Sequence, residues 1–236
     1  QGIGDEIIYS SMIGELADGG LQITLESDPR LVPLMQRSLP GVTVVARREP
    51  AAVDPAAFDC QSPLASLGRW RRASFDSFPR HTGYLKADAE LAKRFSSRLR
   101  RSGPKKVAGI SWSSANRKIG ANKSSALLDW PGVLRVPGTQ FVDLQYGDTA
   151  GAREELRQRD GLEITHLDDV DLFNDLEALA ALCAACDLVI TVSNVTAHLA
   201  GALGKPVWLL APSAQGRIWY WFSGRSDSPW YPSMRI

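Results

Sequence analysis

The pattern of apolar and polar positions is clearest near the end of the chain. Apolar runs at Leu188–Val192 and Val207–Leu210 flank a short helical pattern at Val195–Leu203, which Gly204 ends. Two buried runs around one helix predict a βαβ unit with parallel strands. The polar turn after the first strand then meets a helix N-terminus, whose free N–H groups and positive end suit an anion such as phosphate.

The same alternation precedes this unit. Strands are predicted at residues 107–112, 140–145 and 163–166, and helices at residues 126–134, 150–158 and 175–185. Asn174, followed by Glu177 three residues later, predicts a capping box for the last of these helices. With the βαβ unit, the pattern gives five strands alternating with four helices, which predicts a doubly wound α/β domain.

The first part of the chain alternates less regularly. Helices are predicted at residues 7–18, 30–39 and 88–101, the last with Asp88 as its cap, and strands at residues 21–26 and 42–46. The pattern weakens over residues 47–84. A Gly-rich turn into a helix normally follows a strand, so we expect that strand upstream of Gln1. Ser102-Gly103-Pro104 is typical of a linker, so we predict two Rossmann-like domains, residues 1–102 and 103–236.

Composition narrows the class of protein. The net charge is +1, which gives no case for nonspecific nucleic-acid binding. Cys183 and Cys186 lie in an Ala/Leu-rich helix without a second ligand pair, so we interpret them as core packing rather than a metal or redox site. No apolar tract is long and uncharged enough for a membrane span, and sparse cysteines fit a reducing compartment, so we expect a cytoplasmic protein.

Several motifs together resemble a known family. The segment His198-Leu-Ala-Gly-Ala-Leu-Gly204-Lys-Pro206 and the opening Gly-Ile-Gly-Asp resemble the bacterial heptosyltransferase family, glycosyltransferase family 9. QGIGDE, LQYGD and SPWYPSMR are similar to glycosyltransferase domains that follow tetratricopeptide repeats. The resemblance covers nearly the whole chain. It implies a GT-B fold, in which two Rossmann-like domains face each other across a cleft.

The resemblance also implies a reaction. A sugar moves from a nucleotide-diphosphate donor, held by the C-terminal domain, to a glycan or protein hydroxyl held by the N-terminal domain. Transfer is inverting and needs no metal or other cofactor, and an upstream repeat domain is an implied partner. The chain departs from the family at Ser193-Asn194, where Asp-Thr or Asp-Ser-Gly is usual, so a carboxylate is absent from the phosphate junction.

Asp5 is the candidate catalytic residue. The resemblance implies that it is the general base that takes the acceptor hydroxyl proton. The alternative is a helix cap, a position that Asp favours. Glu6 is its rival for either role, and Gly2, Gly4 and Glu6 form the rest of the acceptor-side loop.

The candidate donor-binding residues follow the strands of the second domain. They are Ser113, Asn116, Lys118, Lys123, Gln145, Tyr146, Ser193, Asn194, Thr196 and His198. A lysine would stabilise the departing diphosphate where other glycosyltransferases use a metal. The alternatives are a solvated basic loop for each lysine and a packed core imidazole for His198. Asp169-Val-Asp171 is interpreted as a solvated loop or nucleoside contact, not a metal site.

Two other classes of function stay open. The chain could be a non-catalytic nucleotide-sugar-binding or scaffold module, which the missing carboxylate and first strand favour slightly. A sugar-nucleotide epimerase shares the two-Rossmann layout but needs several carboxylates near the sugar. The aromatic residues between Trp219 and Tyr231 are interpreted as packing of the C-terminal tail; stacking of a ring on a sugar is possible, but their spacing does not support it.

Overall fold

The computed structural model describes residues 2–51, 53–101, 103 and 106–236. Its strands are β1 (Ile23–Ser27), β2 (Val42–Ala46), β3 (Lys106–Ser111), β4 (Thr139–Asp143), β5 (Leu188–Val192), β6 (Val207–Leu210) and β7 (Met234–Arg235). Its α-helices are α1 (Ile3–Ser10), α2 (Ile13–Asp18), α3 (Val32–Ser38), α4 (Gly68–Arg71), α5 (Ala89–Leu99), α6 (Pro131–Leu134), α7 (Ala150–Asp160), α8 (Leu176–Ala185) and α9 (Val195–Ala202). Short 3₁₀ turns, among them Pro29–Leu31, Ala121–Lys123 and Trp219–Trp221, connect them.

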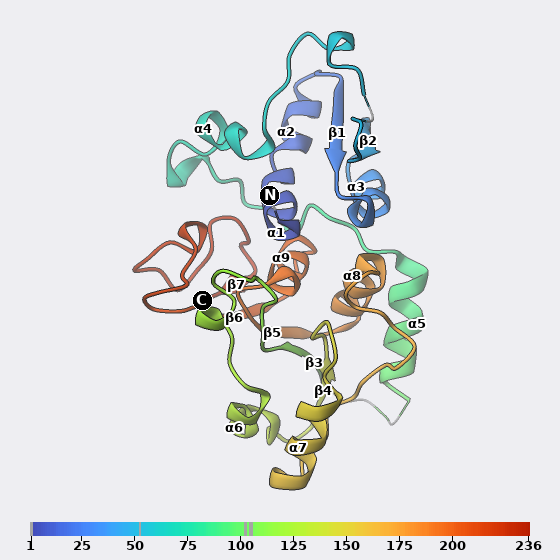
Figure 1. Ribbon diagram of the computed structural model, residues 1–236, viewed down its shortest axis with the longest axis vertical. Helices are drawn as coiled ribbons and strands as arrows, with labels where there is room; N and C mark the ends of the chain where they lie inside the picture. Colours follow the sequence, from blue (N-terminus) through green and yellow to red (C-terminus); the bar gives the residue numbers. More distant parts are fainter. Residues whose placement is uncertain (1, 52, 102, 104–105) are drawn as a thin grey trace.

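The strands form two parallel sheets (Figure 1). β1 pairs with β2, with Ile23 opposite Val42. The second sheet has the strand order β4-β3-β5-β6-β7, and each neighbouring pair is parallel. Because β4 and β5 flank β3 on opposite sides, the connections that follow β3 and β5 diverge at the carboxyl ends of these strands. Such a switch point is where open α/β sheets bind ligands.

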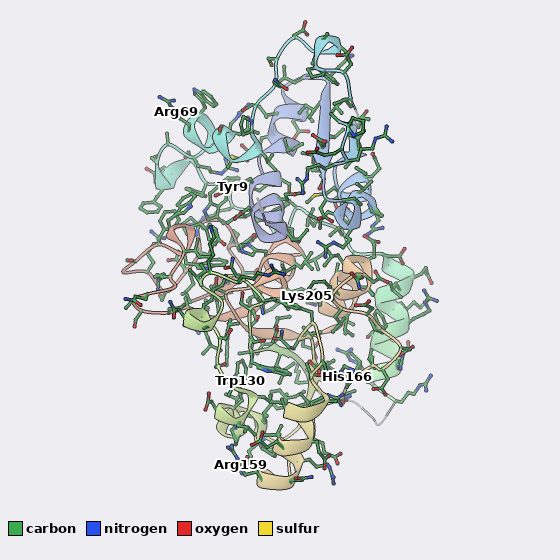
Figure 2. All side chains as sticks on the ribbon, viewed as in Figure 1. Tyr9, Arg69, Trp130, Arg159, His166 and Lys205 are labelled. Carbon is green, nitrogen blue, oxygen red and sulfur yellow. The ribbon has the colours of Figure 1, made fainter. Side chains whose placement is uncertain are left out.

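Helices cover both faces of the larger sheet, because its strands are apolar on both sides. Val189 of β5 belongs to the cluster that contains α8 and α9, whereas the next residue, Ile190, packs with α6 and α7. Figure 1 shows α8 and α9 on one side of this sheet and α6 and α7 on the other. Trp130, just before α6, is buried on the α6 side (Figure 2). This two-sided burial is typical of parallel sheets.

The N-terminal part of the chain packs on α9. α1 lies beside α9 in Figure 1, and residues of both belong to one core cluster. The backbone N–H groups of Tyr84 and Leu85 donate to the carbonyl oxygen of Ala202, at 2.8 and 3.0 Å. The end of α9 therefore satisfies its free carbonyl with the backbone of a segment more than 100 residues earlier in the sequence.

Several local predictions are confirmed. β2, β5 and β6 have the predicted bounds, and the Asp88 side chain caps α5 by accepting from Leu91 N at 2.7 Å. Cys183 and Cys186 are buried in the core, and burial raises the pKa of the Cys186 thiol to about 12. Among the described residues, no helix has both the length and the apolar character needed to cross a membrane.

Other local predictions are wrong. Residues 163–166 form no strand; Thr165 makes an isolated bridge to Val142, and the fifth strand of the sheet is β7, at the end of the chain. The opening helix is two helices, α1 and α2, with a break at residues 11–12. The capping box at Asn174 is also wrong, because the Asp175 side chain caps α8 by accepting from Ala178 N at 2.8 Å. Asn174 instead donates its amide to Asp171.

The predicted linker lies partly outside the described residues, at Ser102 and Pro104. The division into residues 1–102 and 103–236 therefore stays a prediction. The structure describes a separate sheet on each side of this segment.

Two glycines with the same backbone angle test the junction with α9. Gly204 and Gly138 both have φ of +71°, but a Cβ on Gly204 would lie 1.7 Å from the Thr82 carbonyl oxygen, whereas one on Gly138 would have no neighbour within 4 Å. Both alanine variants bear the left-handed strain, so we expect Gly204→Ala to lower the free energy of unfolding by about 2–4 kcal/mol more than Gly138→Ala. Chemical denaturation measures this difference. Equal losses would show that residues 82–83 do not pack on α9.

Candidate functional site

A cavity of about 290 Å³ lies at the carboxyl ends of β3 and β5. Residues from both parts of the chain line it, and each comes from a loop or from the start of a helix. They are Gly2, Ile3, Gly4, Asp5, Arg30, Ser114, Ala115, Asn116, Lys123, Tyr146, Leu172, Phe173, Leu176, Leu179, Ser193, Asn194, Val195, His198, Ile218 and Tyr220. The sheet topology thus gathers at one place residues that are more than 200 positions apart in the sequence.

Asp5 lines this cavity from the first turn of α1. Its Oδ2 accepts a hydrogen bond from Gly2 N at 3.2 Å, which satisfies one free N–H at the start of the helix. Among the described residues, the second carboxylate oxygen accepts no hydrogen bond. The helix begins at Ile3, so Asp5 is its third residue and not the N-cap that the sequence left as the alternative. It contributes to capping through Gly2 N and also lines the cavity.

Glu6 has a different environment. It is 3% exposed, and its carboxylate accepts from the Ser27 hydroxyl and from Asp28 N, both at 2.8 Å. Arg47 Nη1 lies 2.7 Å from its other oxygen. Glu6 does not line the cavity but ties α1 to the carboxyl ends of β1 and β2. It is a poor rival for Asp5, because its charge is already paired.

The loop after β3 brings one of the two predicted lysines to the cavity. Lys123 is 7% exposed and lines the wall, whereas Lys118 is exposed and lies outside it. Burial lowers the pKa of Lys123, and the Asp5 carboxylate opposes that shift. Among the described residues, no carboxylate lies within ion-pair distance of the Lys123 ammonium. A buried cation without a close counterion is suited to an incoming anion.

Asn194 organises the junction between β5 and α9. Its amide group donates to the Ser111 hydroxyl at 2.7 Å and to the Ser113 carbonyl at 2.9 Å, so it ties the ends of β3 and β5 together. Its Oδ1 accepts from Ala197 N, which caps α9. The N–H groups of Val195 and Thr196 belong to the first turn, where no intrahelical acceptor is available. They are the free N–H groups at which the sequence predicts an anion.

Ser193 stands where the family resemblance would place a carboxylate. Its hydroxyl is buried and accepts a hydrogen bond from the indole N–H of Trp221 at 2.8 Å. The partner of Ser193 is thus a neutral donor from the C-terminal tail.

His198 forms part of the cavity wall, with its ring nitrogens already engaged. Nδ1 lies 2.9 Å from the Tyr231 hydroxyl and Nε2 lies 3.2 Å from the Tyr220 hydroxyl. Burial lowers the pKa of His198 to about 3, and the nearby Lys123 charge adds to the effect. A Cβ on Gly4 would lie 2.6 Å from this ring, so α1 and α9 can approach this closely only because residue 4 is glycine. The packed-imidazole alternative accounts for these contacts.

Four other predicted donor residues are buried in the fold or hydrogen-bonded within it. The Gln145 side chain is buried, and its Oε1 accepts from Ser111 Oγ and from the backbone N–H groups of residues 112 and 113. Thr196 is fully buried outside the cavity wall. Tyr146 does line the cavity, and its hydroxyl accepts from Ala115 N at 3.1 Å. Asn116 also lines it, while its Oδ1 accepts from the backbone of residues 118 and 119.

Arg30, Phe173 and Tyr220 also line the cavity and are not among the predicted donor or acceptor residues. Arg30, from the N-terminal part, donates to the Phe173 carbonyl at 3.1 Å and lies 5.9 Å from the Phe173 ring centroid. Tyr220 is 4% exposed and meets His198. No local pattern could have identified this set, because every contact joins segments far apart in the chain.

The Asp169-Val-Asp171 segment has structural partners too. Asp169 forms an ion pair with Arg98 at 2.7 Å, and this contact lowers the pKa of its carboxyl. Asp171 accepts from the backbone N–H groups of Phe173 and Asn174, which, with the Asn174 side chain, lowers its pKa. Both carboxylates thus stabilise an exposed loop, as the solvated-loop interpretation predicts.

The chain is similar to known proteins in sequence and in structure. No known protein-family model matches it. It is 36% identical over 259 aligned residues to Protein FlbA of Caulobacter vibrioides; the alignment covers all of this chain but 41% of that relative's length. The chain thus spans less than half of that relative.

Solved structures of glycosyltransferases share its fold. The E. coli ADP-heptose LPS heptosyltransferase II superposes with a TM-score of 0.63 at 12% identity, over 99% of this chain and 87% of that one. A glycosyl transferase family 9 protein from Veillonella parvula gives 0.60 at 12% identity, over 91% and 80%. The heptosyltransferase TibC, in a complex with ADP-D-beta-D-heptose, gives 0.50 at 15% identity, over 89% and 56%. The chain therefore has the mixed α/β fold of these heptosyltransferases.

The depressed pKa of His198 predicts a pH dependence of stability. The unfolded imidazole, with a pKa near 6.5, takes up a proton before the folded one, whose pKa is about 3. The contribution of His198 is therefore complete above pH 6.5 and is lost as the pH falls toward 3, by up to about 1.4 kcal/mol per pH unit. We expect His198→Gln to flatten the fall in the free energy of unfolding between pH 6.5 and 4. Urea denaturation measures the free energy of unfolding at each pH. If it falls equally steeply with pH in the wild type and the variant, the buried, uncharged environment of His198 is contradicted.

Proposed function

We propose that the protein is a glycosyltransferase of the heptosyltransferase-like family 9, with a GT-B architecture. Residues 1–102 form the acceptor domain and residues 103–236 the nucleotide-sugar domain, and the two face each other across the cavity. The observation that supports this proposal best is that one cavity joins the Asp5 carboxylate, the buried Lys123 and the N-terminus of α9.

The donor's diphosphate lies at the N-terminus of α9. The free N–H groups of the first turn and the positive end of the helix attract its negative charge. Lys123 supplies a cation that is buried at the same wall and has no carboxylate in ion-pair contact among the described residues. Together they stabilise the charge that develops on the leaving nucleoside diphosphate without a metal.

Asp5 acts as the general base. Its second oxygen accepts the proton of the acceptor hydroxyl, which attacks the anomeric carbon. The bond from that carbon to the diphosphate oxygen breaks on the opposite face, so the transfer inverts the configuration. The proton stays on Asp5 until the product leaves, and the nucleoside diphosphate departs as an anion bound by Lys123. The acceptor is a glycan or a protein hydroxyl.

The surroundings of the enzyme are also part of the proposal. The motif resemblance implies tetratricopeptide repeats elsewhere in the full protein that recruit the acceptor, and a cytoplasmic location.

A non-catalytic nucleotide-sugar-binding module is the second candidate. Ser193 favours it, because its hydroxyl is engaged with Trp221 and brings no carboxylate to the phosphate junction. Calorimetry with a panel of nucleotide sugars, followed by mass spectrometry of products from glycan and peptide acceptors, separates the two. Binding without turnover or donor hydrolysis would support the module.

Asp5→Asn should abolish transfer while leaving donor affinity nearly unchanged. The amide oxygen can still accept from Gly2 N, so the helix cap survives, but the general base is lost, and kcat should fall by roughly 10² to 10⁴. Release of nucleoside diphosphate under saturating donor and acceptor measures kcat. A wild-type rate in this variant would remove Asp5 from the mechanism.

Lys123→Met should weaken the binding of nucleoside diphosphates by about 1–3 kcal/mol, the cost of a lost charge-assisted contact. The free nucleoside should bind as before, because it has no phosphate. Lys118→Met is the matched control, since Lys118 is exposed and lies outside the cavity wall. Isothermal calorimetry makes the comparison. Equal effects from the two lysines would contradict the assigned diphosphate position.

Removal of divalent metals should leave transfer unchanged. Lys123 and the helix end carry out the charge neutralisation that a metal would otherwise provide. The measurement is the rate before and after dialysis against EDTA, with Mg²⁺ and Mn²⁺ added back. A strict requirement for either ion would contradict the metal-free mechanism.

A further inference from the structure

The indole of Trp219 is exposed beside Tyr220, a residue of the cavity wall, and does not itself line the cavity. The side chain is 62% exposed, although the residues on either side of it, Ile218 and Tyr220, both line the cavity. The 3₁₀ turn Trp219–Trp221 places it there, with Tyr220 and Trp221 turned inward and buried. An exposed aromatic ring offers a flat apolar face on which a ligand can stack.

Aromatic neighbours fix the orientation of this ring. Trp219 lies nearly parallel to Tyr9 of α1, with an interplanar angle of 17° and ring centroids 6.5 Å apart. It meets Tyr220 edge to face at 5.8 Å and Phe222 at 6.2 Å. The indole is therefore a preorganised surface, and a ligand that stacks on it would not have to order a mobile side chain first.

Trp219 packs on the helix that carries the proposed catalytic base. Tyr9, on which it packs, follows Asp5 by four residues on α1, so both side chains project from the same face of that helix. Burial raises the pKa of Tyr9 to about 12, and the Asp5 carboxylate contributes to the shift. Asp5 also helps raise the pKa of Tyr220. One carboxylate thus acts on both tyrosines that contact the Trp219 ring.

We propose that Trp219 is the stacking platform for a pyranose ring of the acceptor, with one hydroxyl of that sugar directed to Asp5. This inference rests on the proposed function and narrows its acceptor to a glycan. A pyranose has an apolar face of C–H groups and a rim of hydroxyls. A flat indole contacts the first, while a carboxylate beside it accepts from the second.

The position of the ring favours the acceptor over the donor's own sugar. The aromatic contacts of Trp219 are with Tyr9 of α1 and with Tyr220, Phe222 and Trp230 of the tail. In the described part of the chain, none is with the loops after β3 and β5, where the diphosphate is proposed to bind. The platform therefore belongs to the side of the cavity that holds Asp5.

Saturation-transfer NMR on this chain tests the platform. The probes are the methyl glycosides of glucose, galactose, mannose and N-acetylglucosamine, each with and without ADP, UDP or GDP. We expect transfer to the C–H protons of one ring face for at least one glycoside. Trp219→Ala should weaken this binding by about tenfold or more, and Trp219→Phe should weaken it less, because a smaller aromatic face remains.

Trp70→Ala is the matched control. Trp70 is also an exposed tryptophan, at 68%, but lies on α4. Among the described residues its ring has no aromatic contact, whereas Trp219 packs on Tyr9 and Tyr220. Figure 2 shows Arg69, the neighbour of Trp70, at the outer edge of the molecule. This variant should bind the glycosides as the wild type does. A thermal unfolding transition shows whether Trp219→Ala is folded. If it is not, the glycoside affinities of Trp219→Phe and Trp70→Ala are compared instead.

The outcomes separate this inference from the proposed function. If nucleoside diphosphates bind but no glycoside shows saturation transfer in the NMR experiment, the platform is overturned and the glycosyltransferase proposal still stands. Equal glycoside binding by the wild type and the Trp219 variants, or equal losses in the Trp219 and Trp70 variants, would also overturn it. Glycoside binding that depends on Trp219 without any nucleotide binding would support the platform and contradict the proposed donor site.

Discussion

The cavity depends on the close packing of α1 against α9. Gly4 meets the ring of His198 at a distance that no side chain at position 4 would permit. The imidazole is held by hydroxyls of Tyr220 and Tyr231, so the C-terminal tail fixes the surface on which α1 rests. Because Asp5 is the residue after Gly4, this packing also sets where its carboxylate lies.

Hydrogen bonds of neutral groups organise the junction between β5 and α9. Asn194 provides two donor hydrogens to the end of β3 and its loop, and one acceptor to the cap of α9. A carboxylate at this position could cap the helix but could not donate to the Ser113 carbonyl. With Ser193 accepting from Trp221, the junction holds its shape without a negative charge that would repel a diphosphate.

Charge is distributed around the cavity by burial and pairing. Glu6 forms an ion pair with Arg47 and stabilises the fold, whereas Asp5, the residue before it in the same helix, lines the cavity. Lys123 is buried with no ion pair among the described residues, whereas Lys118 is solvated. Asp5 and Lys123 line the cavity, whereas Glu6 and Lys118 do not. The turn of the helix or of the loop separates the two members of each pair.

The sequence by itself determined the local elements and the edge of the sheet where the site lies. The apolar runs of β2, β5 and β6 and the cap of α5 are local patterns, and they were predicted with the observed bounds or cap residue. The position of polar residues after β3 and β5 followed from the parallel arrangement of strands. Local patterns could not distinguish a strand at residues 163–166 from an extended segment with one bridge, because sheet membership depends on a partner.

The tertiary structure alone decided which of the predicted polar residues face the cavity. Gln145 and Thr196 are buried in the junction, whereas Lys123, Arg30 and Tyr220 reach the wall from segments that no sequence spacing connects. The sequence also could not predict that Trp219 is exposed while Tyr220 and Trp221 are buried, because all three residues are aromatic. The physical reason is that burial and hydrogen bonding are settled between segments far apart in the chain, while sequence patterns report on neighbours along it.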